Sequence, residues 1–378
     1  MKKIVFLTAS RADYGKLKTL IVNLQKKKNF EVYVFVTGMH NVKKFGSTWM
    51  KIKLKKYDNI KNVFRFNNQT TIDSTDIILA KTIAGFAKYV KKIKPDLIVV
   101  HGDRIEPLAC SAVGALNNFR TAHIEGGEVS GTVDEIIRHS ISKLSHIHFV
   151  TNQNAKKRLI QMGELSKNIF IIGSPDIEIM MSNKLPDISD VKKHYNIKFD
   201  NYGIGILHSV TTDMQNFRKY VKIFTNVIKK SKQQFILIYP NNDFGSNYIF
   251  KEYEKLKKNN NIRLLPSMRF EFYLTLLKNS NLIIGNSSSG IMEAPVYGVP
   301  TINIGNRQNN RSRLKTIHNV DFNQKKLLKL IDYFFTKKIK YTEQKEFGEG
   351  ESFKLFENAL NSNYLWKIDV QKTFKEIK

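Results

Sequence analysis

The sequence Asp96-Leu97-Ile98-Val99-Val100-His101-Gly102-Asp103-Arg104 joins a short apolar run to a polar turn. A helical pattern follows over residues 105–117, and a second apolar run over 121–125 comes after it. A strand, a helix and another strand in this order are typical of a parallel α/β unit, in which helices cover both faces of the sheet. The chain is therefore predicted to be built from such units.

The same alternation extends in both directions along the chain. In the first half it predicts strands over 3–9, 31–37, 96–100, 121–125, 146–150 and 169–173, and helices over 14–27, 76–94, 105–117, 134–144 and 154–162. A polar stretch over 185–200 interrupts the pattern. Strands are then predicted over 202–208, 234–239, 262–265, 282–285 and 301–304. The fold class is therefore two Rossmann-like, doubly wound domains in series, and the chemistry is expected just after the strands.

Composition limits the classes of function. The 378 residues include 62 Lys plus Arg and 33 Asp plus Glu, giving a net charge of +29, but the lysines are scattered along the whole chain. No nucleic-acid-binding module accompanies them, so a solvated basic surface is favoured and no nucleic-acid partner is expected. No apolar run has the ~20 residues needed to span a bilayer, so no membrane partner is expected either. The single cysteine, Cys110, favours a reducing, cytoplasmic location.

Three carboxylates follow successive strands of the first domain: Asp103, Glu125 and Asp134. A single aspartate after a strand most often caps the next helix. Here, Gly126 and Gly127 lie among the acidic residues, and glycines let a backbone approach a ligand closely. Together, the three carboxylates favour acid/base chemistry on a sugar or another hydroxy compound.

The start of the first predicted helix carries Ser10, Arg11, Asp13 and Lys16. This segment can hold a diphosphate at the helix N-terminus, or Ser10 or Asp13 can simply cap the helix with Arg11 in solvent. Both interpretations stay open. The segment is neither a G-x-G-x-x-G loop nor a Walker A loop, so a nicotinamide cofactor or an ATP site is not expected.

The second domain has an equivalent region after its strand over 282–285. Ser287 and Ser288 precede a helix and can form an anion site or an ordinary cap, while Glu293 can accept hydrogen bonds from a ribose diol. Arg307 follows the next strand and adds fixed positive charge. His208 ends the domain's first strand, where it can face a ligand or be satisfied by its own turn. A nucleoside diphosphate is the predicted ligand.

Metal binding is not predicted. His139, His146 and His148 lie close together in sequence, but they lack the spacing of a known metal-ligand motif.

In their order along the chain, these motifs resemble the hydrolysing UDP-N-acetylglucosamine 2-epimerases of sialic acid synthesis and their relatives in legionaminic acid synthesis. The resemblance covers nearly the whole chain and rests on residues 10–16, 37–40, 101–104, 123–134, 138–144, 172–176, 285–293 and 305–308.

The resemblance implies a glycosyltransferase-B-like fold with the active site in the interdomain cleft. Its N-terminal domain would span 1–175 and its UDP-binding domain 176–361, and a C-terminal helix within 362–378, centred on 364–375, would return to the first domain. The implied reaction is anti elimination of UDP to a glycal followed by hydration, without a cofactor. A homo-oligomer, either a dimer or a tetramer, is expected.

The resemblance also implies roles for individual residues. The acid/base set would comprise Asp103, Glu125 and Asp134, with the choice of C2 base left open, and His208 would act near the sugar and diphosphate. Substrate would be held by Arg11, Lys16, Arg104, Ser287, Ser288, Glu293 and Arg307.

Two local departures bear on the branch of the family. Ser209 stands where the family commonly has proline after the histidine, which affects the rigidity of that turn more than the chemistry. The sequence Glu125-Gly126-Gly127-Glu128-Val129 replaces the Glu-Ala-Gly-Leu-Arg of the non-hydrolysing relatives and favours the hydrolysing branch.

Two alternatives to hydrolysis of UDP-N-acetylglucosamine stay open. One is the same reaction on UDP-2,4-diacetamido-2,4,6-trideoxyglucose, and the other, in another class, is a glycosyltransferase of the same fold.

Overall fold

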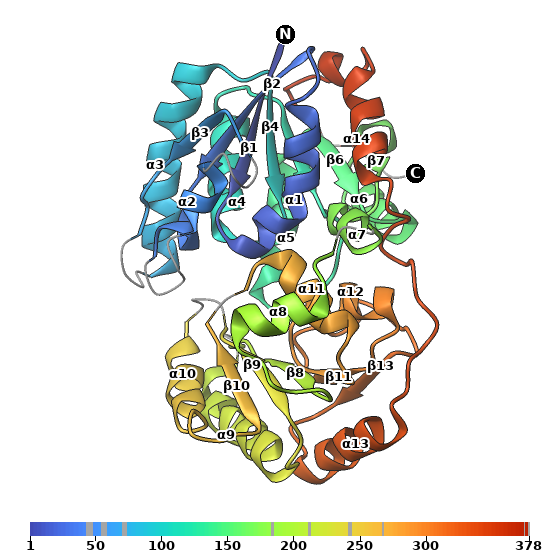
Figure 1. Cartoon of the computed structure of the whole chain (residues 1–378). Coiled ribbons are helices and arrows are strands. Elements are labelled where there is room, and N and C mark those ends of the chain that lie inside the picture. Colours follow the sequence, from blue (N-terminus) through green and yellow to red (C-terminus); the bar gives the residue numbers. More distant parts are fainter. Residues whose placement is uncertain are drawn as a thin grey trace. The chain divides into compact units, whose positions relative to one another are not determined.

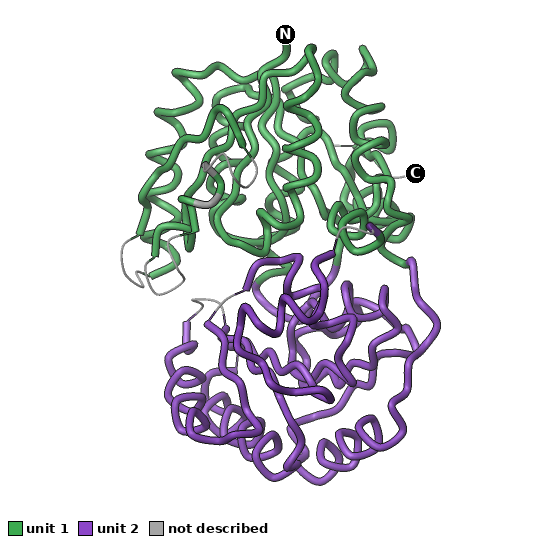
Figure 2. The backbone as a smooth tube through the Cα atoms, viewed as in Figure 1, with its two compact units in different colours: residues 1–128, 134–181, 346–378 green, residues 129–133, 182–345 purple. Residues whose placement is uncertain are grey.

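The structure is a computed structural model that describes residues 1–42, 48–53, 59–69, 74–182, 185–210, 213–240, 244–266, 268–373 and 375–376. It contains two compact units (Figure 2). Unit 1 comprises Met1–Glu128, Asp134–Met181 and Glu346–Lys378, and unit 2 comprises Val129–Val133 and Ser182–Lys345. Each unit has its own parallel sheet, so the prediction of two Rossmann-like domains is confirmed.

Unit 1 is built on a seven-stranded sheet with the order β3-β2-β1-β4-β5-β6-β7. Its strands are β1 (Lys2–Thr8), β2 (Phe30–Val36), β3 (Asn62–Arg65), β4 (Leu97–His101), β5 (Thr121–Ile124), β6 (Ile147–Val150) and β7 (Ile169–Ile171). Its helices are α1 (Arg11–Leu24), α2 (Trp49–Lys53), α3 (Thr75–Ile93), α4 (Ile105–Leu116), α5 (Val133–Leu144), α6 (Gln153–Gln161), α7 (Pro175–Met180) and α14 (Ser352–Asn361), with 3-10 turns at Gly38–Asn41, Ser166–Asn168 and Leu365–Lys367. Because the chain order reverses between β1 and β4, a ligand site is expected at the carboxyl ends of these central strands.

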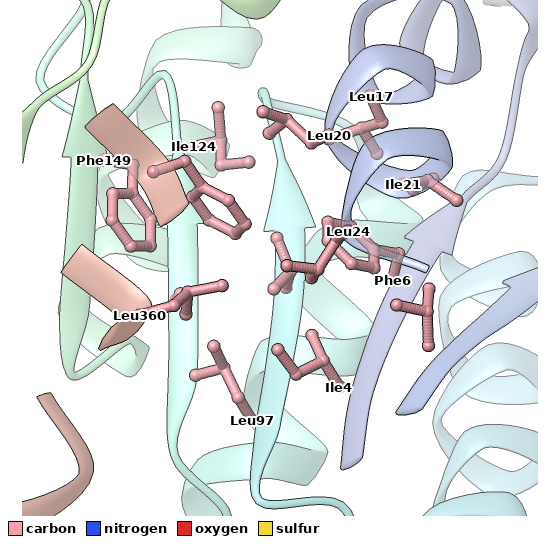
Figure 3. Close-up of a cluster of buried hydrophobic side chains, with 14 of the residues drawn as sticks. Ile4, Phe6, Leu17, Leu20, Ile21, Leu24, Leu97, Ile124, Phe149 and Leu360 are labelled. Atoms are coloured by element: carbon pink, nitrogen blue, oxygen red, sulfur yellow. The ribbon is translucent and has the colours of Figure 1, made fainter. Parts of the chain in front are cut away.

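Different helices cover the two faces of this sheet (Figure 1). Along β1, Ile4 and Phe6 point to one face and pack with α1 and α14, whereas Val5 and Leu7 point to the other face and pack with α3 and α4. This is the two-residue alternation of a strand with both faces covered. Figure 3 shows the first face, with Leu17, Leu20, Ile21 and Leu24 of α1 on one side and Leu360 of α14 beside Phe149 on the other.

The prediction of a helix over 364–375 is wrong. The last α-helix, α14, ends at Asn361, and the described residues after it form only the 3-10 turn Leu365–Lys367. Polar residues at 361–363 end the helix, and the Trp366 indole N–H caps it by donating to the Leu360 carbonyl at 2.7 Å. It is therefore α14 that packs on the sheet of unit 1, with Phe356 lying 4.7 Å from Phe149 between ring centroids.

Unit 2 has a six-stranded sheet with the order β10-β9-β8-β11-β12-β13. Its strands are β8 (Gly203–Ile206), β9 (Phe235–Ile238), β10 (Ile262–Leu265), β11 (Leu282–Gly285), β12 (Thr301–Ile304) and β13 (Ile317–Val320). Its helices are α8 (Ile188–Tyr195), α9 (Met214–Lys230), α10 (Ser246–Glu254), α11 (Phe270–Lys278), α12 (Ser289–Met292) and α13 (Gln324–Lys337), with a 3-10 turn at Ala294–Tyr297. In the described part of the chain, no helix is both long and apolar enough to cross a membrane.

Candidate active site

Glu125 lies at the carboxyl end of β5 in an unusual backbone conformation. Its φ of +64° is in the left-handed region, which residues other than glycine seldom adopt. The side chain is buried, and its carboxylate lies 3.2 Å from Lys16 Nζ and 3.3 Å from His101 Nε2. Side chains of α1 and β4 therefore converge on the carboxylate of Glu125.

The charge state of Glu125 follows from these neighbours. Burial raises the pKa of Glu125, but the positive Lys16 and the contact with His101 outweigh it and hold the pKa well below its usual range. Glu125 is therefore an ionised carboxylate in a nearly water-free position.

Asp103 lies at the turn after β4 and pairs with Arg138 of α5. The Arg138 guanidinium, fully buried, donates one hydrogen bond to the Asp103 carboxylate and another, of 3.2 Å, to the Glu128 carbonyl. Burial lowers the pKa of Arg138, but Asp103, Glu128 and Asp134 outweigh this effect and raise it. Asp103 and Asp134 thus lie around one buried cation, a residue to which the sequence argument gave no role.

Ser174 and Asp176 also belong to this group. Lys16 Nζ lies 3.3 Å from an Asp176 oxygen, and the Ser174 hydroxyl hydrogen-bonds with both Glu125 and Asp176. Both residues follow β7, so the rule that chemistry gathers after strands would have found them. In the sequence, Ser174 and Asp176 stand out only as part of the resemblance.

The start of α1 supports the capping interpretation for Ser10 and Asp13. Ser10 accepts a hydrogen bond from the Asp13 backbone, and the Asp13 carboxylate accepts from the backbone N–H groups of Ala9, at 2.8 Å, and Ser10, at 2.9 Å. These two N–H groups are thereby already bonded within the turn. Arg11 is half-buried as the first residue of α1.

Arg104 occupies the N-cap position of α4, and its side chain makes no capping hydrogen bond there. It precedes α4, and its Nε lies 3.8 Å from the buried carboxylate of Glu106.

The buried histidines of unit 1 have structural partners. His123 hydrogen-bonds with Ser142 at 2.9 Å and with the Gly102 carbonyl at 2.8 Å, and burial lowers its pKa to about 3. His148 pairs with Glu164 at 2.9 Å, and burial lowers its pKa. Among the residues that the structure describes, no group of three or more His, Cys, Asp or Glu side chains is arranged to hold a metal ion.

In unit 2, Asn286 joins the residues predicted to bind the nucleotide. Its side-chain oxygen accepts from the His208 backbone N–H at 2.7 Å, and its amide donates to the His208 carbonyl at 2.9 Å. Its own carbonyl accepts from Arg307 at 3.2 Å and from Gln308 at 3.1 Å. His208 and Arg307, which lie far apart in sequence, are therefore tied to one buried asparagine.

Ser287, Ser288 and Glu293 flank the short helix α12. The Ser287 hydroxyl accepts from the Ser289 backbone at 3.3 Å, and the half-buried Ser288 is the N-cap residue. Glu293 is buried at the C-terminal end of α12. The Ser209 hydroxyl next to His208 is buried without a hydrogen-bond partner among the described residues, and Thr211 and Thr212 lie outside that part of the chain.

Residues 22–361 of the chain match the sequence profile of a protein family described as UDP-N-acetylglucosamine 2-epimerase. The chain belongs to this epimerase family, and it is an enzyme of that family.

Relatives within the epimerase family have three kinds of name. A protein from Neisseria meningitidis serogroup B, named UDP-N-acetylglucosamine 2-epimerase, is 41% identical over 100% of both chains. A Legionella pneumophila protein named UDP-N,N'-diacetylbacillosamine 2-epimerase (hydrolyzing) is 31% identical over 93% of each chain. The polysialic acid biosynthesis protein P7 of Escherichia coli is 35% identical over 83% of this chain and 81% of its own.

Solved structures of epimerases have the same fold. A UDP-GlcNAc 2-epimerase from Neisseria meningitidis, solved with UDP-GlcNAc bound, has a TM-score of 0.78 at 19% identity, over 95% of this chain and 99% of that one. An enzyme from Methanocaldococcus jannaschii, in complex with UDP-GlcNAc and UDP, has a TM-score of 0.78 at 23% identity over the same shares. The glycosyltransferase-B-like, two-domain fold of this epimerase family member is thereby established.

Proposed function

We propose that this enzyme hydrolyses UDP-N-acetylglucosamine with inversion at C2, giving N-acetylmannosamine and UDP for sialic acid synthesis. The observation that carries the proposal is the presence in unit 1 of two carboxylates paired with buried cations, Asp103 with Arg138 and Glu125 with Lys16. Carboxylates held close to fixed cations can exchange protons with a substrate without losing their orientation.

The proposed reaction has two steps. In the first, a carboxylate removes the proton on C2 while the C1–O bond breaks, so that UDP leaves with the bonding electrons and a 2-acetamidoglucal remains. In the second, water adds its hydroxyl to C1, and a proton enters C2 from the opposite face. The acid/base groups in this scheme are Asp103, Glu125 and Asp134.

In the proposal, the nucleotide is held by the side chains that the resemblance implies. Arg307, Ser287 and Ser288 hold the diphosphate and Glu293 the ribose, with His208 beside the sugar and diphosphate. Arg11, Lys16 and Arg104 add positive charge. The bonds from Arg307 and His208 to Asn286 support this part of the proposal, because they fix both groups at the carboxyl ends of neighbouring strands.

The same reaction on UDP-2,4-diacetamido-2,4,6-trideoxyglucose, for legionaminic acid synthesis, is the second candidate. The name of the Legionella relative favours it, whereas the name of the Neisseria relative with higher identity favours the first. We further propose that the enzyme acts in the cytoplasm, that it forms a homo-oligomer and that it needs no cofactor.

The decisive experiment incubates the purified enzyme with each sugar nucleotide separately in heavy water. We expect release of UDP, a free 2-epimer and deuterium at C2, with faster turnover of UDP-N-acetylglucosamine. Epimerised sugar still joined to UDP would show a non-hydrolysing reaction and contradict the proposal. Faster turnover of the diacetamido sugar would select the second candidate, and absence of deuterium from C2 would indicate glycosyl transfer.

A further inference from the structure

Ser174 contacts two buried carboxylates with one hydroxyl group. Its Oγ lies within hydrogen-bonding distance of Glu125 Oε1 and of Asp176 Oδ1. It is the N-cap residue of α7, yet its side chain makes no capping hydrogen bond. Because a serine hydroxyl carries one hydrogen, it can donate to only one carboxylate at a time. The second contact is a hydrogen bond only when that carboxyl group carries a proton.

Lys16 contacts the same two carboxylates as Ser174. Lys16 Nζ lies 3.2 Å from Glu125 and 3.3 Å from Asp176, so one ammonium group serves two carboxylates. Asp176 is completely buried, and His101 Nε2 lies 3.3 Å from Glu125. Buried carboxylates depend on such partners to keep their positions.

Ser174 is held in place by the segment of unit 1 that returns after residue 345. Its backbone N–H donates to the Phe347 carbonyl at 2.6 Å, and its carbonyl accepts from the Ser352 hydroxyl at 3.1 Å. Pro175 then fixes the first turn of α7. The hydroxyl is thus presented to the two carboxylates from a rigid backbone.

We propose that Ser174 and Asp176 are positioning residues for the reaction, which hold the Glu125 carboxylate in one orientation. Ser174 contacts Glu125 directly, and Asp176, which contacts the same hydroxyl group and Lys16, fixes the position of both of these partners. This inference rests on the proposed function, in which Glu125 is an acid/base group.

The test compares Ser174→Ala and Ser174→Thr in steady-state assays of UDP release. We expect Ser174→Ala to lower kcat at least about tenfold with KM little changed, since it removes part of the ~100-fold or more that an acid/base group supplies. Ser174→Thr retains the hydroxyl and should recover most of the lost kcat. Asp176→Asn, which removes one of the two negative charges beside Lys16, should also lower kcat.

Two matched controls separate positioning from stability. Ser111→Ala removes a buried hydroxyl that donates to the Leu108 carbonyl at 3.0 Å, and Glu178→Gln changes a carboxylate one turn further along α7 that accepts from the Phe353 N–H at 2.9 Å. Both should keep kcat, and melting curves should show that all variants fold. Unchanged kcat in Ser174→Ala, failure of Ser174→Thr to recover it, or an equal loss in Ser111→Ala would overturn the inference while the wild-type enzyme still releases UDP. A wild-type enzyme that releases no UDP overturns the proposed function and this inference with it.

Discussion

The side-chain amide of Asn286 bonds to His208 as a neighbouring strand would, accepting from its backbone N–H at 2.7 Å and donating to its carbonyl at 2.9 Å. Asn286 is 1% exposed, so neither group of His208 has water as a substitute partner. The turn after β8 therefore depends on one side chain from the turn after β11.

We expect Asn286→Ala to lower the free energy of unfolding by about 2–4 kcal/mol, because it leaves two buried backbone groups of His208 unpaired. Asn286→Asp should do comparable harm, because its second oxygen would face the His208 carbonyl. Urea unfolding measures both effects. The exposed Asn309→Ala is the control and should unfold like the wild type; an Asn286→Ala protein of wild-type stability would contradict the described pairing.

Turnover should depend on each of the three carboxylates. Asp103→Asn, Glu125→Gln and Asp134→Asn are each expected to fold and to lower turnover at least ~100-fold, the usual scale for an acid/base group. The measurement is UDP release under saturating substrate. Asp187→Asn serves as the control, because asparagine can replace the aspartate that caps α8. A fully active variant would remove its residue from the acid/base set.

The positions of Asp103 and Glu125 were predictable because strands end where apolar runs end. Strands β10, β11 and β12 have the predicted bounds, and most others differ by one or two residues. Strands β3 and β13 were not predicted, since Asn62 and Arg65 in one and His318 and Asn319 in the other break the apolar pattern. Both are edge strands, where one side of the backbone needs no partner and polar residues are tolerated.

The partners of the site residues were not predictable in the same way. Arg138 reaches Asp103 across 35 positions of sequence, and Lys16 reaches Glu125 across 109. Such pairs depend on the order of strands in the sheet, which local patterns do not specify. Asn286 was similarly hidden, since an asparagine after a strand is ordinarily a turn residue.

Acid should weaken the fold through the buried histidines. The pKa of His123 is lowered by burial to about 3, whereas a histidine in the unfolded chain titrates near 6.5. Below that value the unfolded chain binds a proton that folded His123 does not. Stability is therefore fully present above pH ~6.5 and falls as the pH drops toward about 3.

Urea midpoints measured between pH 7.5 and 4.5 test this expectation. A His123→Gln protein should be less stable at pH 7.5 but should lose less stability on acidification than the wild type. The exposed His194→Gln is the control and should keep the wild-type slope. Identical slopes in all three proteins would refute the role of His123.

Lys372 should stabilise unit 1 by capping α5. Its ammonium group donates to the carbonyls of Lys143 at 2.9 Å and Ser145 at 2.6 Å, and to Glu164 at 2.6 Å. We expect Lys372→Ala to lower the free energy of unfolding by about 1–3 kcal/mol, the scale of charge-assisted hydrogen bonds. Thermal melting of Lys372→Ala beside the exposed Lys367→Ala measures the difference, and equal melting temperatures would refute the capping role.

The division of unit 1 into separate stretches of chain has a consequence for synthesis. Residues 182–345 of unit 2 leave the ribosome before residues 346–378, which contain α14 and complete the sheet packing of unit 1. Until then, one face of the first sheet lacks its cover by α14, although most of the second sheet has already been synthesised. During that interval Phe149 and its neighbours are exposed to chaperones or to other chains, so the emergence of residues 346–378 governs whether the first unit matures.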